Sequence, residues 1–151
     1  MSEREIIICR DAVELNRKAA EQFISLVGEA ARRSGRFAVA LSGGSTPKAL
    51  YSLLASCEYQ SRLDWDRIHL FWGDERCVPP DHPESNYRMV QEALLSRINI
   101  PPANIHRMAG EKEPAEAANE YEEELRSFFA LAPGQVPPII PQRGSAQATD
   151  N

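Results

Sequence analysis

The chain has 151 residues, of which 42% are hydrophobic and 26% are charged, with a formal net charge of −5. This length and balance are typical of one globular domain, and an acidic chain has no basic excess with which to bind nucleic acid or an anionic membrane. Three cysteines that are far apart and lack a CxxC pair favour a cytoplasmic protein and indicate neither a disulfide framework nor a metal site.

The first apolar segment, IIICR at Ile6–Arg10, predicts a strand and is too short for a signal peptide or a membrane span. Asp11, with Glu14 three residues later, predicts a capping box at the start of a long helix that ends at Gly35. Apolar residues recur along this helix in steps of three and four, which predicts one stripe facing the core: Ala12, Leu15, Ala19, Phe23, Leu26 and Ala30.

A second strand is predicted at Phe37–Leu41, and the stretch SGGSTP follows it. Its glycines allow a tight turn, Ser45 and Thr46 are N-cap candidates, and Pro47 suits the first helical position. Unpaired amides and the positive end of a helix dipole converge at such a turn and favour an anion. Because the ending of a P-loop and the third glycine of a dinucleotide motif are missing, we expect a small phosphate ester; an ordinary strand-to-helix turn is the alternative.

The remaining elements alternate in the same way. A third strand is predicted at Ile68–Trp72, a third helix over 84–98 and a fourth helix at Pro114–Ala130, while residues 104–108 fit either class. Residues 131–151 are rich in proline and lack periodicity, which predicts a disordered tail after a domain at 1–130. The alternation predicts an α/β fold with a parallel sheet and helices on both faces.

The third predicted strand is followed by GDER, which contains Asp74, Glu75 and Arg76. Ligands of open α/β sheets bind at the carboxyl ends of the strands, where both SGGSTP and GDER are expected. The planar guanidinium of Arg76 suits bidentate contact with phosphate, although a local ion pair that caps a loop is the alternative. His69, His82 and His106 show no metal-ligand spacing, and His82 is the candidate among them for a general base.

The stretches ALSGGSTPKALYSLL and WDRIHLFWGDERCVPPDHPESNYRMVQEALL resemble the N-terminal half of the 6-phosphogluconolactonase family, over roughly Glu5 to Ala130. This resemblance implies a Rossmann-like open parallel sheet that is incomplete relative to the family. It implies hydrolysis of 6-phosphoglucono-δ-lactone, a small phosphorylated sugar lactone, in the oxidative pentose phosphate pathway, without metal or organic cofactor. The residues that it places at the sugar-phosphate site are Gly43, Gly44, Ser45, Thr46, Asp74 and Arg76, supported by Ser42, Glu75 and Asn86.

The sequence departs from the family after its predicted domain. The family continues with another strand and an Asp-Gly-His motif, whose histidine acts as general base, and no Asp-Gly-His occurs here. We expect a truncation near Pro138, as a splice variant, a frameshift or a shortened gene model. Two functions stay open: a lactonase in which another residue, such as His82, replaces the missing base, and a non-catalytic fragment that at most binds a sugar phosphate.

Overall fold

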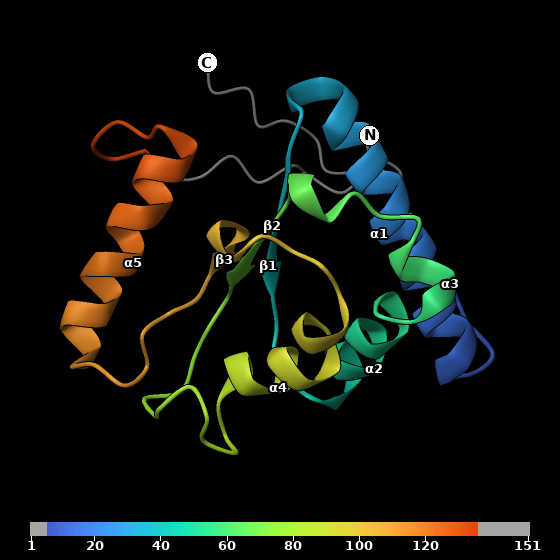
Figure 1. Ribbon diagram of the computed structural model, residues 1–151, viewed down its shortest axis with the longest axis horizontal. Coiled ribbons are helices and arrows are strands. Elements are labelled where there is room, and N and C mark those ends of the chain that lie inside the picture. Colours follow the sequence, from blue (N-terminus) through green and yellow to red (C-terminus); the bar gives the residue numbers. More distant parts are fainter. Residues whose placement is uncertain (1–5, 136–151) are drawn as a thin grey trace.

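The computed structural model describes residues 6–135, which form three parallel strands and the helices around them (Figure 1). The strands are β1 (Phe37–Leu41), β2 (Ile68–Trp72) and β3 (Ile105–His106), in the order β1-β2-β3. The helices are α1 (Ala12–Ser34), α2 (Ser45–Leu54), α3 (Cys57–Gln60), α4 (Asn86–Ala93) and α5 (Pro114–Phe129), with 3₁₀ turns at Trp65–Arg67, Leu95–Arg97 and Pro102–Asn104. The predicted α/β fold is confirmed, and the segment that fitted either class contributes the short strand β3.

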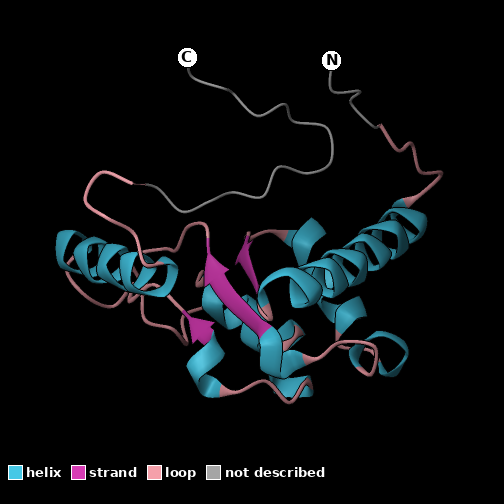
Figure 2. Cartoon of the chain, turned by 90° about the horizontal axis from the view of Figure 1, so that it is seen from above, coloured by secondary structure: helices cyan, strands magenta, loops and turns pink. Residues whose placement is uncertain are grey.

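The two faces of the sheet are covered unequally. The pairing of Val39 with Leu70 places alternate residues of β1 and β2 on one face, and there the buried side chains of α1, α2 and α4 form the core. The opposite face carries Phe71 and His106, which pack against Phe128 of α5. Figures 1 and 2 show α1 and α5 on opposite sides of the strands. No residue of α5 is fully buried, so this helix covers its face only lightly.

Helix α1 begins and ends where the sequence predicts. The Asp11 carboxylate accepts a hydrogen bond from the Glu14 amide at 2.8 Å, and Gly35 ends the helix with a φ of 77°. The capping box is only half formed, because the Glu14 carboxylate accepts from the Arg10 amide at 2.9 Å. The predicted stripe is only partly buried, with Ala30 inside and Leu15 exposed. A 23-residue helix is about 34 Å long and a five-residue strand about 17 Å, so α1 is about twice as long as the strands β1 and β2.

The predicted strand at Ile6–Arg10 is wrong. This segment has no strand conformation, and Ile6, Ile7 and Ile8 are 80%, 55% and 91% exposed. A run of β-branched residues becomes a strand only where a neighbouring backbone supplies the other half of its hydrogen bonds. Within residues 6–135, no strand pairs with this segment. The predicted tail at 131–151 falls largely outside the described residues and stays a prediction.

Candidate functional site

The SGGSTP stretch forms the sharp turn from β1 into α2. Gly44 is the N-cap of α2, with φ 103° and ψ 168°, and the helix begins at Ser45. The prediction that Ser45 or Thr46 would cap the helix is therefore wrong, and Pro47 is the third helical residue. A backbone with this φ favours glycine, so the glycine rather than a hydroxyl residue occupies the cap. No side chain caps the first amides of α2, which leaves those amides and the exposed hydroxyls of Ser45 and Thr46 available to a ligand.

Gly43 brings this turn against the second motif. A Cβ atom on Gly43 would lie 2.2 Å from the Asn86 Oδ1 atom, so only glycine fits beside that side chain. The Asn86 side-chain Nδ2 atom donates to the Asp74 backbone carbonyl at 3.1 Å, and the Gly73 backbone amide donates to the Leu41 carbonyl at 2.9 Å. These contacts join the ends of β1 and β2 to the start of α4. The two motifs that the sequence placed at one sheet edge are thus in contact, with Asn86 between them.

Glu75 caps α4 from the loop after β2. Its Oε1 atom accepts from the backbone amides of Arg76 at 2.8 Å and Asn86 at 2.7 Å. Its Oε2 atom accepts from the Tyr87 amide at 2.9 Å and from the Ser85 hydroxyl at 3.1 Å. A carboxylate at a helix N-terminus is stabilised by the helix dipole and by the unpaired amides. The alternative of a local ion pair is therefore wrong for the described residues: Glu75 caps the start of α4 by accepting from backbone amides and from the Ser85 hydroxyl.

Arg76 and Asp74 remain directed to solvent at this edge. Both residues are exposed, and the Arg76 guanidinium forms no hydrogen bond or ion pair with any of residues 6–135. The backbone of Arg76 packs closely against Gly110, because a Cβ atom on Gly110 would lie 2.2 Å from the Arg76 carbonyl oxygen. The Arg76 guanidinium is thus accessible to solvent, on a backbone that packs against Gly110. The sequence could not predict this role of Gly110, because it shows only a single glycine before the fourth predicted helix.

Ser42 is held by its backbone. Its amide donates to the Tyr51 hydroxyl at 3.0 Å, and that hydroxyl donates to the Ser42 carbonyl at 2.9 Å. Burial raises the pKa of the Tyr51 phenol above its usual value of 10.0. Ser42 and Thr46 also border an apolar groove of about 340 Å³ between α1, β1 and α2. Tyr51, a buried residue of α2, thus holds the backbone of the turn in place. The sequence could not predict this role, because a tyrosine on the inner face of a predicted helix is equally expected to be an ordinary core residue.

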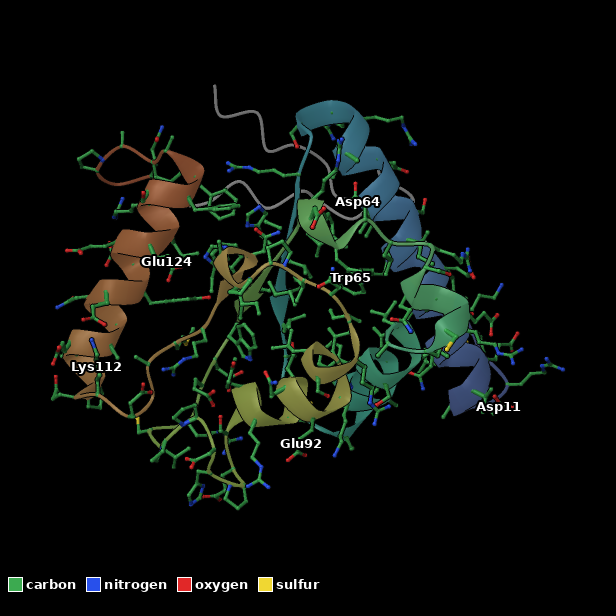
Figure 3. The ribbon with its side chains drawn as sticks, viewed as in Figure 1. Asp11, Asp64, Trp65, Glu92, Lys112 and Glu124 are labelled. Atoms are coloured by element: carbon green, nitrogen blue, oxygen red, sulfur yellow. The ribbon has the colours of Figure 1, made fainter. Side chains whose placement is uncertain are left out.

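The histidines divide between two places. The His82 Nδ1 atom accepts from the Glu84 amide at 3.2 Å within its own loop. On the α5 face, the His69 Nδ1 and His106 Nε2 atoms are 3.1 Å apart, and the His106 Nδ1 atom lies 2.5 Å from the Glu124 Oε1 atom (Figure 3 labels Glu124 on α5). Burial, together with the nearby His106 and Arg36, lowers the pKa of His69 below 6.5. The sequence did not predict the contact between His69 and His106, because the two residues are 37 positions apart.

Residues 6–135 contain no group of three or more histidine, cysteine, aspartate or glutamate side chains arranged to hold a metal ion. None of their helices combines the length and the apolarity that crossing a bilayer requires.

Comparisons with known proteins agree on one family. Residues 10–140 match the family described as glucosamine-6-phosphate isomerases/6-phosphogluconolactonase. The chain is 42% identical over 137 residues to the 6-phosphogluconolactonase of Nostoc sp., covering 90% of this chain and 55% of that protein. It is 51% identical over 91 residues to the Haemophilus influenzae 6-phosphogluconolactonase, covering 60% of this chain and 39% of that protein.

Solved structures show the same likeness. The crystal structure of devB protein superposes with a TM-score of 0.75 at 38% identity, over 84% of this chain and 52% of that one. The 6-phosphogluconolactonase from Trypanosoma cruzi gives 0.70 at 30% identity, over 85% and 52%. The present chain therefore spans about half the length of these relatives.

Proposed function

The chain belongs to the family of glucosamine-6-phosphate isomerases and 6-phosphogluconolactonases, and from this premise we propose that the edge formed by the ends of β1 and β2 binds a small phosphorylated sugar lactone. The first amides of α2 and the hydroxyls of Ser45 and Thr46 would receive the phosphate oxygens. Arg76 would contact the same phosphate with two N–H groups, and Asp74 would accept from a sugar hydroxyl. Gly43 and Gly44 keep the turn free of side chains, so that a ligand can approach its backbone.

The unpaired guanidinium of Arg76 is the single observation that carries this proposal. Seven other Arg and Lys side chains, namely Arg10, Arg62, Arg67, Arg88, Arg107, Lys112 and Arg126, pair with carboxylates. The net charge of −5 supplies no general attraction for an anion. Affinity for phosphate must therefore come from local groups, and Arg76 is a cationic side chain on this edge.

The reaction proposed for this site is hydrolysis of 6-phosphoglucono-δ-lactone to 6-phosphogluconate. In such a hydrolysis, water attacks the lactone carbonyl, and a general base within hydrogen-bond reach removes its proton. The Nδ1 atom of His82, the candidate base among the described residues, already accepts from a backbone amide. This contact favours the second candidate function, binding without hydrolysis. The three unpaired cysteines of the chain, two of them exposed, agree with a reducing compartment such as the cytoplasm.

Titration calorimetry with 6-phosphogluconate and with gluconate tests the binding proposal. We expect only the phosphorylated compound to bind, and Arg76→Ala to weaken its binding by about 1.5–3 kcal/mol, roughly 10- to 150-fold. Arg76→Lys keeps the charge but loses the planar fork, so its loss should be smaller. Arg97→Ala is the matched control, because Arg97 is an exposed arginine on a 3₁₀ turn. Equal affinities for the two compounds, or an Arg76→Ala variant that binds like Arg97→Ala, would contradict the proposal.

A second assay separates the two functions. Freshly generated 6-phosphogluconolactone is added to the chain, and acid release is compared with the spontaneous rate. Hydrolysis that is lost in Arg76→Ala identifies a lactonase whose base lies among the present residues. Binding in calorimetry without hydrolysis identifies a sugar-phosphate binder. The Arg76→Ala sample also controls for a contaminating enzyme, since a contaminant would be unaffected by the substitution.

A further inference from the structure

Two loops pack against each other beneath Arg76. The Arg76 loop, residues 73–85, follows β2, and the β3–α5 loop, residues 107–113, leads into α5 (Figure 1). A Cβ atom on Gly110 would lie 2.2 Å from the Arg76 carbonyl oxygen, 2.9 Å from the Val78 carbonyl oxygen and 3.3 Å from the Glu75 Cγ atom. At such close packing, one backbone cannot shift toward the other without displacing it. The β3–α5 loop therefore limits where the Arg76 backbone can lie.

An ion pair closes the β3–α5 loop around Gly110. The Arg107 guanidinium donates two hydrogen bonds to the Glu111 carboxylate, from Nη1 to Oε2 at 2.9 Å and from Nη2 to Oε1 at 2.6 Å. The two side chains are only 32% and 34% exposed, and the hydrogen bonds from Arg107 lower the pKa of Glu111 from 4.5 to about 2. Bidentate geometry fixes the orientation of the two groups. Because Gly110 lies between them in sequence, the pair also restrains the turn that carries Gly110.

Arg107 also contacts the start of α4. Its guanidinium carbon lies 5.6 Å from the centroid of the Tyr87 ring, which is within the range of a cation–π interaction. The Tyr87 backbone amide donates to the Glu75 Oε2 atom at 2.9 Å, and the Arg76 amide donates to the Glu75 Oε1 atom at 2.8 Å. Arg107 thus joins the loop that packs beneath Arg76 to the helix that Glu75 caps.

We propose that Arg107, through its ion pair with Glu111, is a positioning residue for the anion contact of Arg76. Arg107 is not among the groups that would touch the phosphate. It holds Gly110 against the Arg76 backbone, so that the guanidinium starts from a restricted set of positions and less freedom is lost when an anion binds. The alternative is an ordinary surface ion pair, which would contribute little. The inference rests on the proposed function, because the position of the guanidinium matters only if an anion binds there.

Amide hydrogen exchange tests the positioning without a ligand. Peptides that cover residues 74–79 are followed by mass spectrometry in the unmodified chain and in Arg107→Ala and Glu111→Gln. We expect exchange in these peptides to be about threefold to tenfold faster in both variants, because the hydrogen bonds of the loop open more often. Arg126→Ala and Glu122→Gln are the matched controls, since they remove an ion pair with the same four-residue spacing on α5 and should leave these peptides unchanged.

A double-mutant cycle tests whether the pair acts through Arg76. In calorimetry with 6-phosphogluconate, Arg107→Ala should weaken binding by about threefold to tenfold in the unmodified chain and have no effect in an Arg76→Ala background. A residue that contacts the ligand itself, or that only stabilises the whole fold, would cost the same affinity in both backgrounds. Glu111→Gln should behave like Arg107→Ala, and it supplies both comparisons if Arg107→Ala does not fold.

Three outcomes would overturn the inference. They are loop exchange in Arg107→Ala and Glu111→Gln that equals exchange in the controls, equal losses of affinity with and without Arg76, and faster loop exchange with unchanged affinity. Failure of the proposed function is distinguishable from these outcomes. If the unmodified chain does not bind 6-phosphogluconate but loop exchange is faster in Arg107→Ala and Glu111→Gln alone, the proposed function is rejected and the control of the Arg76 loop by Arg107 is supported.

Discussion

Replacing Glu75 by glutamine tests whether one carboxylate organises the loop that carries Arg76. The two Glu75 oxygens accept four hydrogen bonds, from the amides of Arg76, Asn86 and Tyr87 and from the Ser85 hydroxyl. Glutamine keeps one acceptor oxygen and turns an NH₂ group toward the other two donors. The substitution therefore removes the negative charge from the start of α4 and opposes donor to donor at two of the four contacts.

The expected loss follows from those contacts. A hydrogen bond to a charged group contributes about 1.5–3 kcal/mol, and a buried donor left without a partner costs about 1–3 kcal/mol. Ser85 and Asn86 are both buried, so water cannot replace the lost acceptor without opening the loop. Because neighbouring contacts are not additive, we expect Glu75→Gln to lower the free energy of unfolding by about 2–4 kcal/mol.

Urea unfolding followed by circular dichroism measures this loss as a shift of the midpoint at constant slope. Glu84→Gln is the matched control, because that side chain lies in the same loop, is 72% exposed and approaches only His82 at 4.0 Å. The control should change stability by less than about 0.5 kcal/mol. The reasoning is refuted if both variants unfold at the same urea concentration. It is also refuted if Glu75→Gln is destabilised yet keeps full affinity for 6-phosphogluconate, since the loop would then not depend on this carboxylate.

Three further predictions concern other parts of the chain. Gly43→Ala should lower the free energy of unfolding by about 1–3 kcal/mol and weaken phosphate binding, because its Cβ would lie 2.2 Å from an α4 side chain; Gly28→Ala, within α1 and 3.6 Å from the nearest atom, should stabilise. Tyr121→Phe should cost about 1–3 kcal/mol in urea unfolding, since the Tyr121 hydroxyl contacts both backbone groups of Trp72 at 2.9 Å; an unchanged midpoint would reject that anchor. Because burial lowers the pKa of His69 beneath its unfolded value of about 6.5, the unfolded chain binds this proton more readily, so stability should fall as pH drops below about 6.5, and His69→Gln should show a smaller fall.

Local features of the fold and site were predictable because they depend on backbone sterics and short-range hydrogen bonds. The strands at Phe37–Leu41 and Ile68–Trp72, the Asp11 cap and the stop at Gly35 all follow from residues within a few positions of each other. The meeting of SGGSTP with GDER followed from one topological rule, since parallel strands align their carboxyl ends.

The two wrong predictions, a strand at Ile6–Arg10 and a cap of α2 at Ser45 or Thr46, failed because each depends on contacts with residues distant in the sequence. Ile6–Arg10 has the composition of a strand, but a strand exists only where a second backbone accepts and donates its hydrogen bonds. The position of the α2 cap depended on the positive φ of Gly44, next to the close packing of Gly43 against Asn86 of α4, and the local sequence does not specify that contact.

By itself, the sequence determined the parallel α/β alternation and the choice of Gly43, Glu75 and Arg76 as residues of one edge, because periodicity, turn sterics and motif order are encoded locally. Only the tertiary structure decided that Glu75 accepts from backbone amides while the Arg76 guanidinium has no partner among residues 6–135, and that His69 contacts His106 from a distant strand. These distinctions arise from packing between segments far apart in the chain. That packing determines which polar groups find partners and which are left for a ligand.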